Sequence, residues 1–218
     1  RWIGLMYYPD RLRDGDPLQK LRMESLTDLV FGLALALSSI TLIIRADETV
    51  GEIVYSLFWF SFNFIILISV WFAYSTLLEN IRIETPVVLW LNVFLLLLVS
   101  MEPYVLNLMA FTEDPQGFGG LLDSTSSLYG LTLGGIWLIM GALYHQAAKG
   151  GGSALTRQLR DDRLVDAAIF LLSAAPVFWD IELVDVPVRF WMWFLTIPVG
   201  AALSATRKVR EKRGERTA

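Results

Sequence analysis

Three polar side chains, Arg22, Thr27 and Asp28, stand directly before an uncharged run at residues 29–44. A carboxylate at membrane depth needs hydrogen bonds or a counter-charge, because lipid supplies neither. Arg22 and Asp28 are six residues apart, so they do not face each other squarely on one helix. Their partners are therefore expected on other segments of the chain.

The candidate partners are Asn92, Tyr74 and Ser75, which are hydrogen-bonding side chains on two later apolar segments. With Arg22, Thr27 and Asp28 they predict a structural polar network at the inner end of a helix bundle. The alternative is that Thr27 or Asp28 caps a helix N-terminus at the membrane interface, a role for which both residue types are suited.

Branched aliphatic side chains recur at helical spacing along the uncharged run. Leu33, Leu37, Ile40 and Ile44 follow one another at intervals of four, three and four residues, so on a helix they form one narrow stripe. This aliphatic stripe could line a pore or pack in a core. A helix with such a stripe is expected to have helical neighbours on more than one side.

The composition indicates an integral membrane protein. Of the 218 residues, 55% are hydrophobic and 18% are charged, and the mean hydropathy is +0.51. Segments that can cross about 30 Å of hydrocarbon, at about 1.5 Å per residue, predict an all-α fold with six transmembrane helices. These segments are residues 29–44, 53–78, 86–111, 124–146, 164–183 and 187–206. The first and the fifth are short for a full crossing.

The positions of the basic residues predict that both termini are cytoplasmic. Of the 18 Lys and Arg residues, all except Arg45 and Arg189 then fall on the inner side. The outer loops carry acidic residues instead, namely Asp47, Glu48, Glu52, Glu102, Glu113, Asp114, Asp123, Asp180, Glu182 and Asp185. We therefore expect a multi-pass protein of the cell membrane, with a cytoplasmic segment at 1–21, a six-helix membrane domain at 22–206 and a basic cytoplasmic tail at 207–218.

Enzymatic and metal sites have no support in the sequence. The chain has no Cys and a single His, His145, which excludes thiolate and multi-histidine metal sites. No combination of nucleophile, base and orienting residue is present. Residues 132–135, Thr-Leu-Gly-Gly, are only faintly similar to a carbonyl selectivity filter, and close helix packing through glycine is the favoured interpretation. We expect no enzyme activity, no cofactor, no nucleic-acid partner and no TVGYG-type filter.

Two motifs in the first half of the chain carry a family resemblance. The first is Arg22-x-x-x-Leu26-Thr27-Asp28, and the second is Leu89-Trp90-Leu91-Asn92 followed by Pro103. They resemble the Arg-x-x-x-Phe-Ser-Asp signature and the Leu-Trp-Leu-Asn segment of the transmembrane protein 175 family of potassium channels, found in lysosomes and in prokaryotes. The resemblance spans most of residues 20–206 and is to the prokaryotic members.

This resemblance implies a homotetramer in which the first of six helices in each subunit lines a central pore. Carried over by position, the family's hydrophobic constriction falls on Leu33, Leu37 and Ile40, the residues of the aliphatic stripe. Rings of such side chains close a pore by excluding water from it. The family's pore-facing Thr is Ala36 in this chain, which implies a weaker preference for potassium.

The expected function is therefore that of a potassium-permeable cation channel, with potassium as the permeant ion and other copies of the chain and the lipid bilayer as partners. The alternatives are a secondary transporter, or a weakly selective cation or proton channel. Proline-interrupted helices favour a transporter, whereas the lack of an evident inverted repeat or midplane charge pair disfavours it. A membrane-embedded enzyme is least favoured, because the apolar segments lack clustered His, Asp or Glu.

Overall fold

The computed structural model describes residues 17–44, 49–80, 85–111, 121–149, 153–178, 181–184, 186–196, 199–200, 202 and 206. The long helices are α1 (Pro17–Ile44), α2 (Val50–Asn80), α3 (Pro86–Phe111), α4 (Leu121–Lys149) and α5 (Ala154–Ser173). A 3-10 helix, η3 (Pro176–Phe178), and two short strands, β1 (Glu182–Leu183) and β2 (Val186–Pro187), follow α5. Residues 188–196 are again helical.

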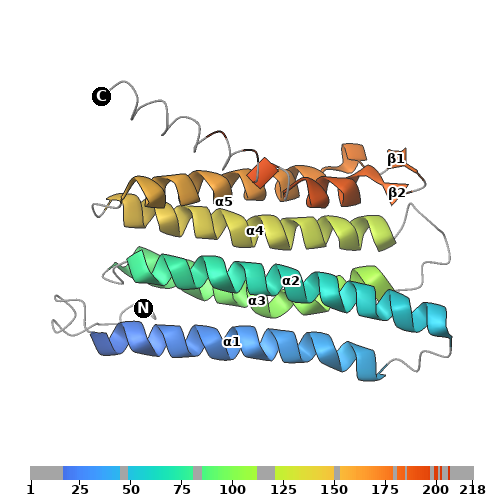
Figure 1. The fold of residues 1–218 in the computed structure, drawn as a ribbon, viewed down its shortest axis with the longest axis horizontal. Coiled ribbons are helices and arrows are strands. Elements are labelled where there is room, and N and C mark those ends of the chain that lie inside the picture. The colour runs from blue at the N-terminus through green and yellow to red at the C-terminus, as the bar shows by residue number, and fades with distance from the viewer. Residues whose placement is uncertain are drawn as a thin grey trace, which may run out of the picture.

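The long helices run side by side in layers (Figure 1). α1 forms one outer layer and packs on α2 and α3, which occupy the middle. α4 packs on α3 from the other side, and α5 covers α4. The other described helices therefore cover α1 on one side.

Four of these helices are long and apolar enough to cross a membrane, over Lys20–Ile40, Val50–Leu78, Pro86–Met109 and Ser124–Lys149. They correspond to the first four predicted segments, although α1 starts at Pro17 rather than at residue 29. Proline suits this first helical position, because its fixed backbone angle is helical and its missing amide hydrogen would be unpaired there. The first helix is thus long enough for a full crossing, contrary to the prediction.

The predicted fifth segment, 164–183, is wrong at both ends. α5 begins at Ala154, where the side chain of Ser153 accepts a hydrogen bond from the backbone nitrogen of Thr156 at 3.3 Å. It ends at Ser173, because Pro176 has no amide hydrogen and disfavours a helical conformation in the residue before it. This early end brings α5 to 20 residues, the first ten of which carry several charges.

A small hairpin replaces the end of the predicted fifth segment. Glu182 pairs with Pro187 and Leu183 with Val186 in antiparallel register, and Val184 between them adopts a left-handed φ of 56°. Within the described residues, this hairpin is the one departure from the predicted all-α fold. The predicted sixth segment, 187–206, is helical at 188–196 and at 199–200, 202 and 206, and its other positions lie outside the described residues.

Glycines bring α4 close to its neighbours. A Cβ atom at Gly134 would lie 2.7 Å from Cγ of Leu171 on α5, and one at Gly135 would lie 2.9 Å from Cδ1 of Leu98 on α3. At Gly134 the added atom would also lie 3.1 Å from the backbone nitrogen of Leu171, so the helices themselves are close there, whereas at Gly135 the end of the Leu98 side chain would have to move. The predicted close helix packing through Gly134 and Gly135 is confirmed.

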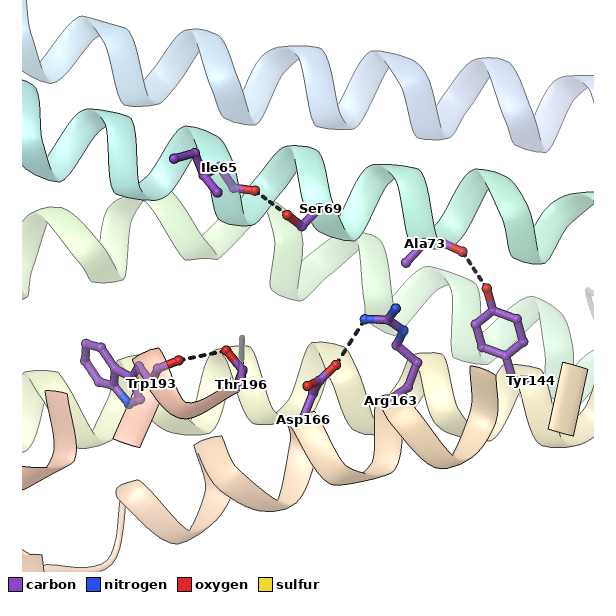
Figure 2. Close-up of polar contacts among 8 residues, drawn as sticks. All are labelled: Ile65, Ser69, Ala73, Tyr144, Arg163, Asp166, Trp193 and Thr196. Carbon is purple, nitrogen blue, oxygen red and sulfur yellow. Dashed lines mark hydrogen bonds and ion pairs between the residues drawn. The ribbon is translucent and has the colours of Figure 1, made fainter. Parts of the chain in front are cut away.

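Among the polar contacts drawn in Figure 2, one joins two layers and the others lie within single helices. The hydroxyl of Tyr144 on α4 donates to the carbonyl oxygen of Ala73 on α2 at 2.8 Å. On α5, Arg163 pairs with Asp166 at 3.0 Å and lies over the ring of Trp137 on α4, 4.7 Å from its centroid. These contacts hold α4 between α2 and α5.

Candidate pore helix and its polar contacts

α1 has one buried face and one exposed face. The buried face consists of side chains that are 4% exposed or less, namely Thr27, Phe31, Ala34 and Ser38. Leu33, Leu37 and Ile40 lie on the other face and are 58%, 43% and 42% exposed. The aliphatic stripe is therefore not part of this subunit's own core. The side chain of Ile44 lies outside the described residues.

Two small residues share the exposed face of α1. Ala36 is exposed, and a Cβ atom placed on Gly32 would meet nothing within 4 Å. Ser39 lies beside them, but its hydroxyl donates to the carbonyl oxygen of Ala36 at 2.8 Å and is thereby turned to its own helix. The exposed face of α1 near the stripe is consequently aliphatic and close to the backbone.

Asp28 is bound by a residue that the sequence analysis did not nominate. The indole Nε1 of Trp71 on α2 donates to Oδ1 of Asp28 at 2.9 Å. Asn92, Tyr74 and Ser75 were the predicted partners. The alternative of a helix cap is wrong, because α1 begins at Pro17 and Asp28 lies well inside it.

Thr27, Tyr74 and Asn92 form the buried part of the predicted polar network. The hydroxyl of Tyr74 donates to Oδ1 of Asn92 at 2.9 Å, and the same phenol interacts with Thr27. Thr27 also donates to the carbonyl oxygen of Met23 at 2.8 Å. These contacts join α1, α2 and α3. Arg22 is exposed and, among the described residues, is not brought into this network.

Glu102 lies inside the bundle, which corrects its predicted place in an outer loop. It is 0% exposed on α3, which continues through Pro103 to Phe111. Tyr129 on α4 donates to its Oε1 at 2.9 Å. The signal that could have found it is a single acidic residue inside the uninterrupted apolar segment 86–111.

Asn63 of α2 connects this buried carboxyl group to α1. Its amide nitrogen faces Glu102 and donates to Oε2 at 2.6 Å, while its amide oxygen accepts from the hydroxyl of Ser38. The reverse orientation would set the amide oxygen against the carboxyl oxygens, which are acceptors too. Neither Asn63 nor Ser38 was predicted as a functional residue, since an Asn or Ser in an apolar segment carries little signal by itself.

A metal site is not found in the part of the chain that the structure describes, where no three His, Cys, Asp or Glu residues are grouped to hold an ion. The features that stand out are the exposed aliphatic stripe on α1 and two buried polar networks on the other side of this helix. One network contains Tyr74 and Asn92, and the other contains Asn63 and Glu102. The stripe can exclude water, and the networks can fix the position of α1.

Comparison with known proteins matches the part of the chain that carries these features. Residues 22–103 match the family model described as the endosomal/lysosomal potassium channel TMEM175. This similarity to the family covers less than half of the 218 residues. The match begins at Arg22 and ends at Pro103, which are the first and last residues of the two motifs, and it includes α1, Trp71, Asn92 and Glu102.

A similarity in fold extends beyond the matched residues. The structure is similar to a crystal structure of the potassium channel MtTMEM175, a variant bound to a nanobody–MBP fusion protein, with a TM-score of 0.58. The similarity covers 88% of this chain and 93% of that one, at 18% sequence identity, and so concerns the fold alone. No curated protein matches the chain by sequence.

Proposed function

We propose that the chain is the subunit of a potassium-permeable cation channel, a homotetramer in which α1 of each copy surrounds a central pore. The aliphatic stripe of α1 carries this proposal, because no other described helix of the subunit covers this apolar face and other copies of the chain can. A single helix cannot enclose a pore, whereas symmetric copies around one axis can. The family description and the potassium channel of similar fold support the same assignment.

The constriction consists of three stacked rings, formed by Leu33, Leu37 and Ile40. Their spacing in a helix places successive rings about 6 Å and about 4.5 Å apart along the axis. An aliphatic ring offers a cation nothing in exchange for its hydration shell, so a narrow ring excludes water and ions. Conduction then requires a wider ring that admits hydrated ions.

Ion preference in this pore is modest. Ala36 supplies no hydroxyl on the exposed face, and the Ser39 hydroxyl is engaged by the carbonyl oxygen of Ala36. Potassium is easier to dehydrate than sodium, so an aliphatic constriction retains some preference for potassium without a ligand to strengthen it. No TVGYG-type filter and no cofactor take part, and potassium is the transported ion.

The membrane domain comprises residues 22–206 with six helices, placed in the cell membrane with both termini cytoplasmic. The start of α1, the end of α4 and the start of α5 lie at the same end of the bundle (Figure 1). These ends carry Lys20, Arg22, Lys149 and Arg157. Basic residues favour the cytoplasmic side, so this end faces the cytoplasm.

Ion flux through the purified protein tests the function. Liposomes that contain the protein should release potassium at more than roughly ten thousand ions per second per assembly. A secondary transporter does not readily reach this rate, because its conformational steps take microseconds to milliseconds or longer. Sodium should pass more slowly. Saturable flux far below this rate would favour a secondary transporter, and equal flux of all monovalent cations, or of protons alone, would favour the weakly selective cation or proton channel.

Cysteine cross-linking tests the placement of α1. The chain has no Cys, so Leu37→Cys introduces a single thiol per subunit. Four copies meet at the constriction, and this thiol should form disulfide-linked dimers on oxidation. Leu35 is partly buried against the subunit core, and Leu35→Cys is the matched control that should cross-link much less. Equal cross-linking at both positions, or a monomer in mild detergent, would exclude the pore.

A further inference from the structure

A series of hydrogen-bonded, buried side chains, called the buried polar chain below, joins α1, α2, α3 and α4 at the level of the constriction. It runs from Ser38 through Asn63 and Glu102 to Tyr129. These four side chains are 4%, 1%, 0% and 0% exposed, in that order. In apolar surroundings an unmade hydrogen bond is costly, so the members of such a chain fix one another's positions.

The end of the buried polar chain at Tyr129 is held by further contacts. The ring of Tyr129 lies 5.1 Å from the ring of Trp193, centroid to centroid. The indole of Trp193 in turn donates to the hydroxyl of Ser173 on α5 at 2.8 Å. Tyr129 is thereby fixed against the peripheral helices, and Glu102 is fixed through Tyr129.

The other end of the buried polar chain, at Ser38 on α1, lies beside a small cavity. A cavity of about 10 Å³ lies between α1, α2 and α3, lined by Ser38, Asn63 and Pro103 together with neighbouring side chains. Atoms that border a void lack contacts on that side. At this level, the hydrogen bond between Ser38 and Asn63 joins α1 to α2 beside the cavity.

Ser38 has a competing acceptor on its own helix. Its hydroxyl lies 3.1 Å from the carbonyl oxygen of Ala34, one turn earlier in α1. A Ser hydroxyl has one proton to donate. When the proton goes to Asn63 it joins α1 to α2, and when it goes to Ala34 it stays within α1.

We propose that Glu102 is a positioning residue of the channel, which acts through Asn63 on Ser38 and so sets the rotation of α1 that presents Leu37 to the pore. This inference rests on the proposed function of α1. Glu102 accepts on both carboxyl oxygens, which turns the amide nitrogen of Asn63 toward it and leaves the amide oxygen for Ser38. Leu37 is the residue next to Ser38, so a rotation of Ser38 moves the constriction directly.

A double-mutant cycle on the rotation of α1 tests this role. In the Leu37→Cys channel, reconstituted in liposomes, the rate of modification by a water-soluble cationic thiol reagent reports the exposure of position 37 to the pore. Ser38→Ala removes the hydroxyl at one end of the buried polar chain, and Tyr129→Phe removes the hydroxyl at its other end. Each should change the modification rate by about three- to tenfold, the range expected from one buried hydrogen bond. The double variant should change it no more than the larger single effect, because both substitutions interrupt the same chain.

Thr132→Ala is the matched control for Tyr129→Phe. The Thr132 hydroxyl is also buried on α4, but it donates to the carbonyl oxygen of Leu128 on the same helix, at 2.8 Å. Its loss should leave the modification rate within about twofold of the parent, and its effect should add to that of Ser38→Ala.

Substitutions at position 102 separate hydrogen bonding from packing. Glu102→Gln keeps an oxygen that accepts from the amide nitrogen of Asn63 and gains a nitrogen that can donate to the Tyr129 hydroxyl, so Asn63 keeps its orientation toward Ser38. The modification rate should therefore stay close to the parent. Glu102→Leu fills similar space without hydrogen bonds and should reproduce the effect of Ser38→Ala.

Two results would overturn the positioning role. One is additive effects of Ser38→Ala and Tyr129→Phe, and the other is an unchanged modification rate in every variant of the buried polar chain. If Glu102→Leu does not assemble, the two hydroxyl deletions decide, since each removes one oxygen atom. A Leu37→Cys channel that conducts but whose thiol is unreactive would instead overturn the pore assignment of α1. The same cycle is then read from thermal unfolding, where additivity would overturn the coupling between Ser38 and Tyr129 itself.

Discussion

The indole nitrogen of Trp71 lies 2.9 Å from Oδ1 of Asp28 and donates a hydrogen bond that joins α2 to α1. One turn further along α2, the hydroxyl of Tyr74 donates to Asn92 and joins α2 to α3, also at 2.9 Å. Positions three apart share a helix face, so a single face of α2 makes both bonds. α2 therefore connects the candidate pore helix to the body of the subunit.

Removal of the Trp71 donor should weaken this connection. Trp71→Phe keeps an aromatic ring and deletes the nitrogen, and it should lower the free energy of unfolding by about 1–2 kcal/mol, the cost of one hydrogen bond to a polar partner. Asp28→Asn keeps the acceptor oxygen and should cost less than Asp28→Ala. Thermal unfolding in detergent measures both differences. Trp90 on α3 is 50% exposed, and Trp90→Phe should have little effect; a loss as large as that of Trp71→Phe would contradict a specific bond.

A methyl group on Gly134 should separate α4 from α5. In Gly134→Ala the new Cβ would lie 2.7 Å from Cγ and 3.1 Å from the backbone nitrogen of Leu171, so a helix must move. We expect a loss of about 1–3 kcal/mol from overpacking, which exceeds the gain of at most about 1 kcal/mol in helix propensity. Gly51→Ala is the control, because its Cβ would meet only the hydroxyl of Thr49 at 3.9 Å. Equal stability of the two variants would mean that α4 and α5 are not in close contact.

Truncation of Leu37 should open the constriction. Leu37→Ala shortens the side chain in every copy and lets water into the ring, so basal potassium flux should rise by about tenfold or more, equal to a barrier lowered by about 1.4 kcal/mol. The fold of the subunit should change little, since Leu37 is 43% exposed within it. Truncation of a core leucine would cost about 2–5 kcal/mol. Poor assembly without added flux would assign Leu37 to packing between helices.

A hydroxyl at position 36 should strengthen the preference for potassium. Ala36→Thr places an oxygen on the exposed face of α1 that can replace part of an ion's hydration shell. The permeability ratio of potassium to sodium should rise by about twofold or more, equal to about 0.4 kcal/mol, and appear as a shift in reversal potential under bi-ionic conditions. Ala36→Val has the same shape without the oxygen and should not raise the ratio. The same ratio for Thr and Val would show that position 36 does not contact the ion path.

The exposed face of α1 could be predicted because helical periodicity is a local property. The spacing of Leu33, Leu37 and Ile40 alone requires them to share a face, and in the structure they do. The partner of Asp28 was predicted at Tyr74 or Ser75 on α2 or at Asn92 on α3, whereas the bond comes from Trp71, one turn before Tyr74 on α2. Sequence spacing identifies a helix face, whereas the contact level depends on how two helices slide along each other.

The buried network was missed for two reasons, although an acidic residue inside the apolar segment 86–111 was a signal for its central member, Glu102. Glu102 and Pro103 together resemble the end of a membrane segment, yet α3 continues past them, because a proline in a membrane helix is tolerated where neighbouring groups satisfy the freed carbonyl. The partners of Glu102 also lie on other helices, and their convergence is a property of the packed bundle. The end of α5 was missed for the opposite reason, since there Pro176 does stop the helix.

The close approach of α4 and α5 has a mechanical consequence. Gly130, Gly134 and Gly141 set the two backbones so near each other that little space is left for α4 and α5 to move relative to one another. The cavity lies at the opposite interface, where α1 meets α2 and α3. If α1 lines a pore, as proposed, the less tightly packed interface lies beside that pore and the tightly packed pair of helices lies away from it. We then expect a change in pore diameter to move α1 more than it moves α4 and α5.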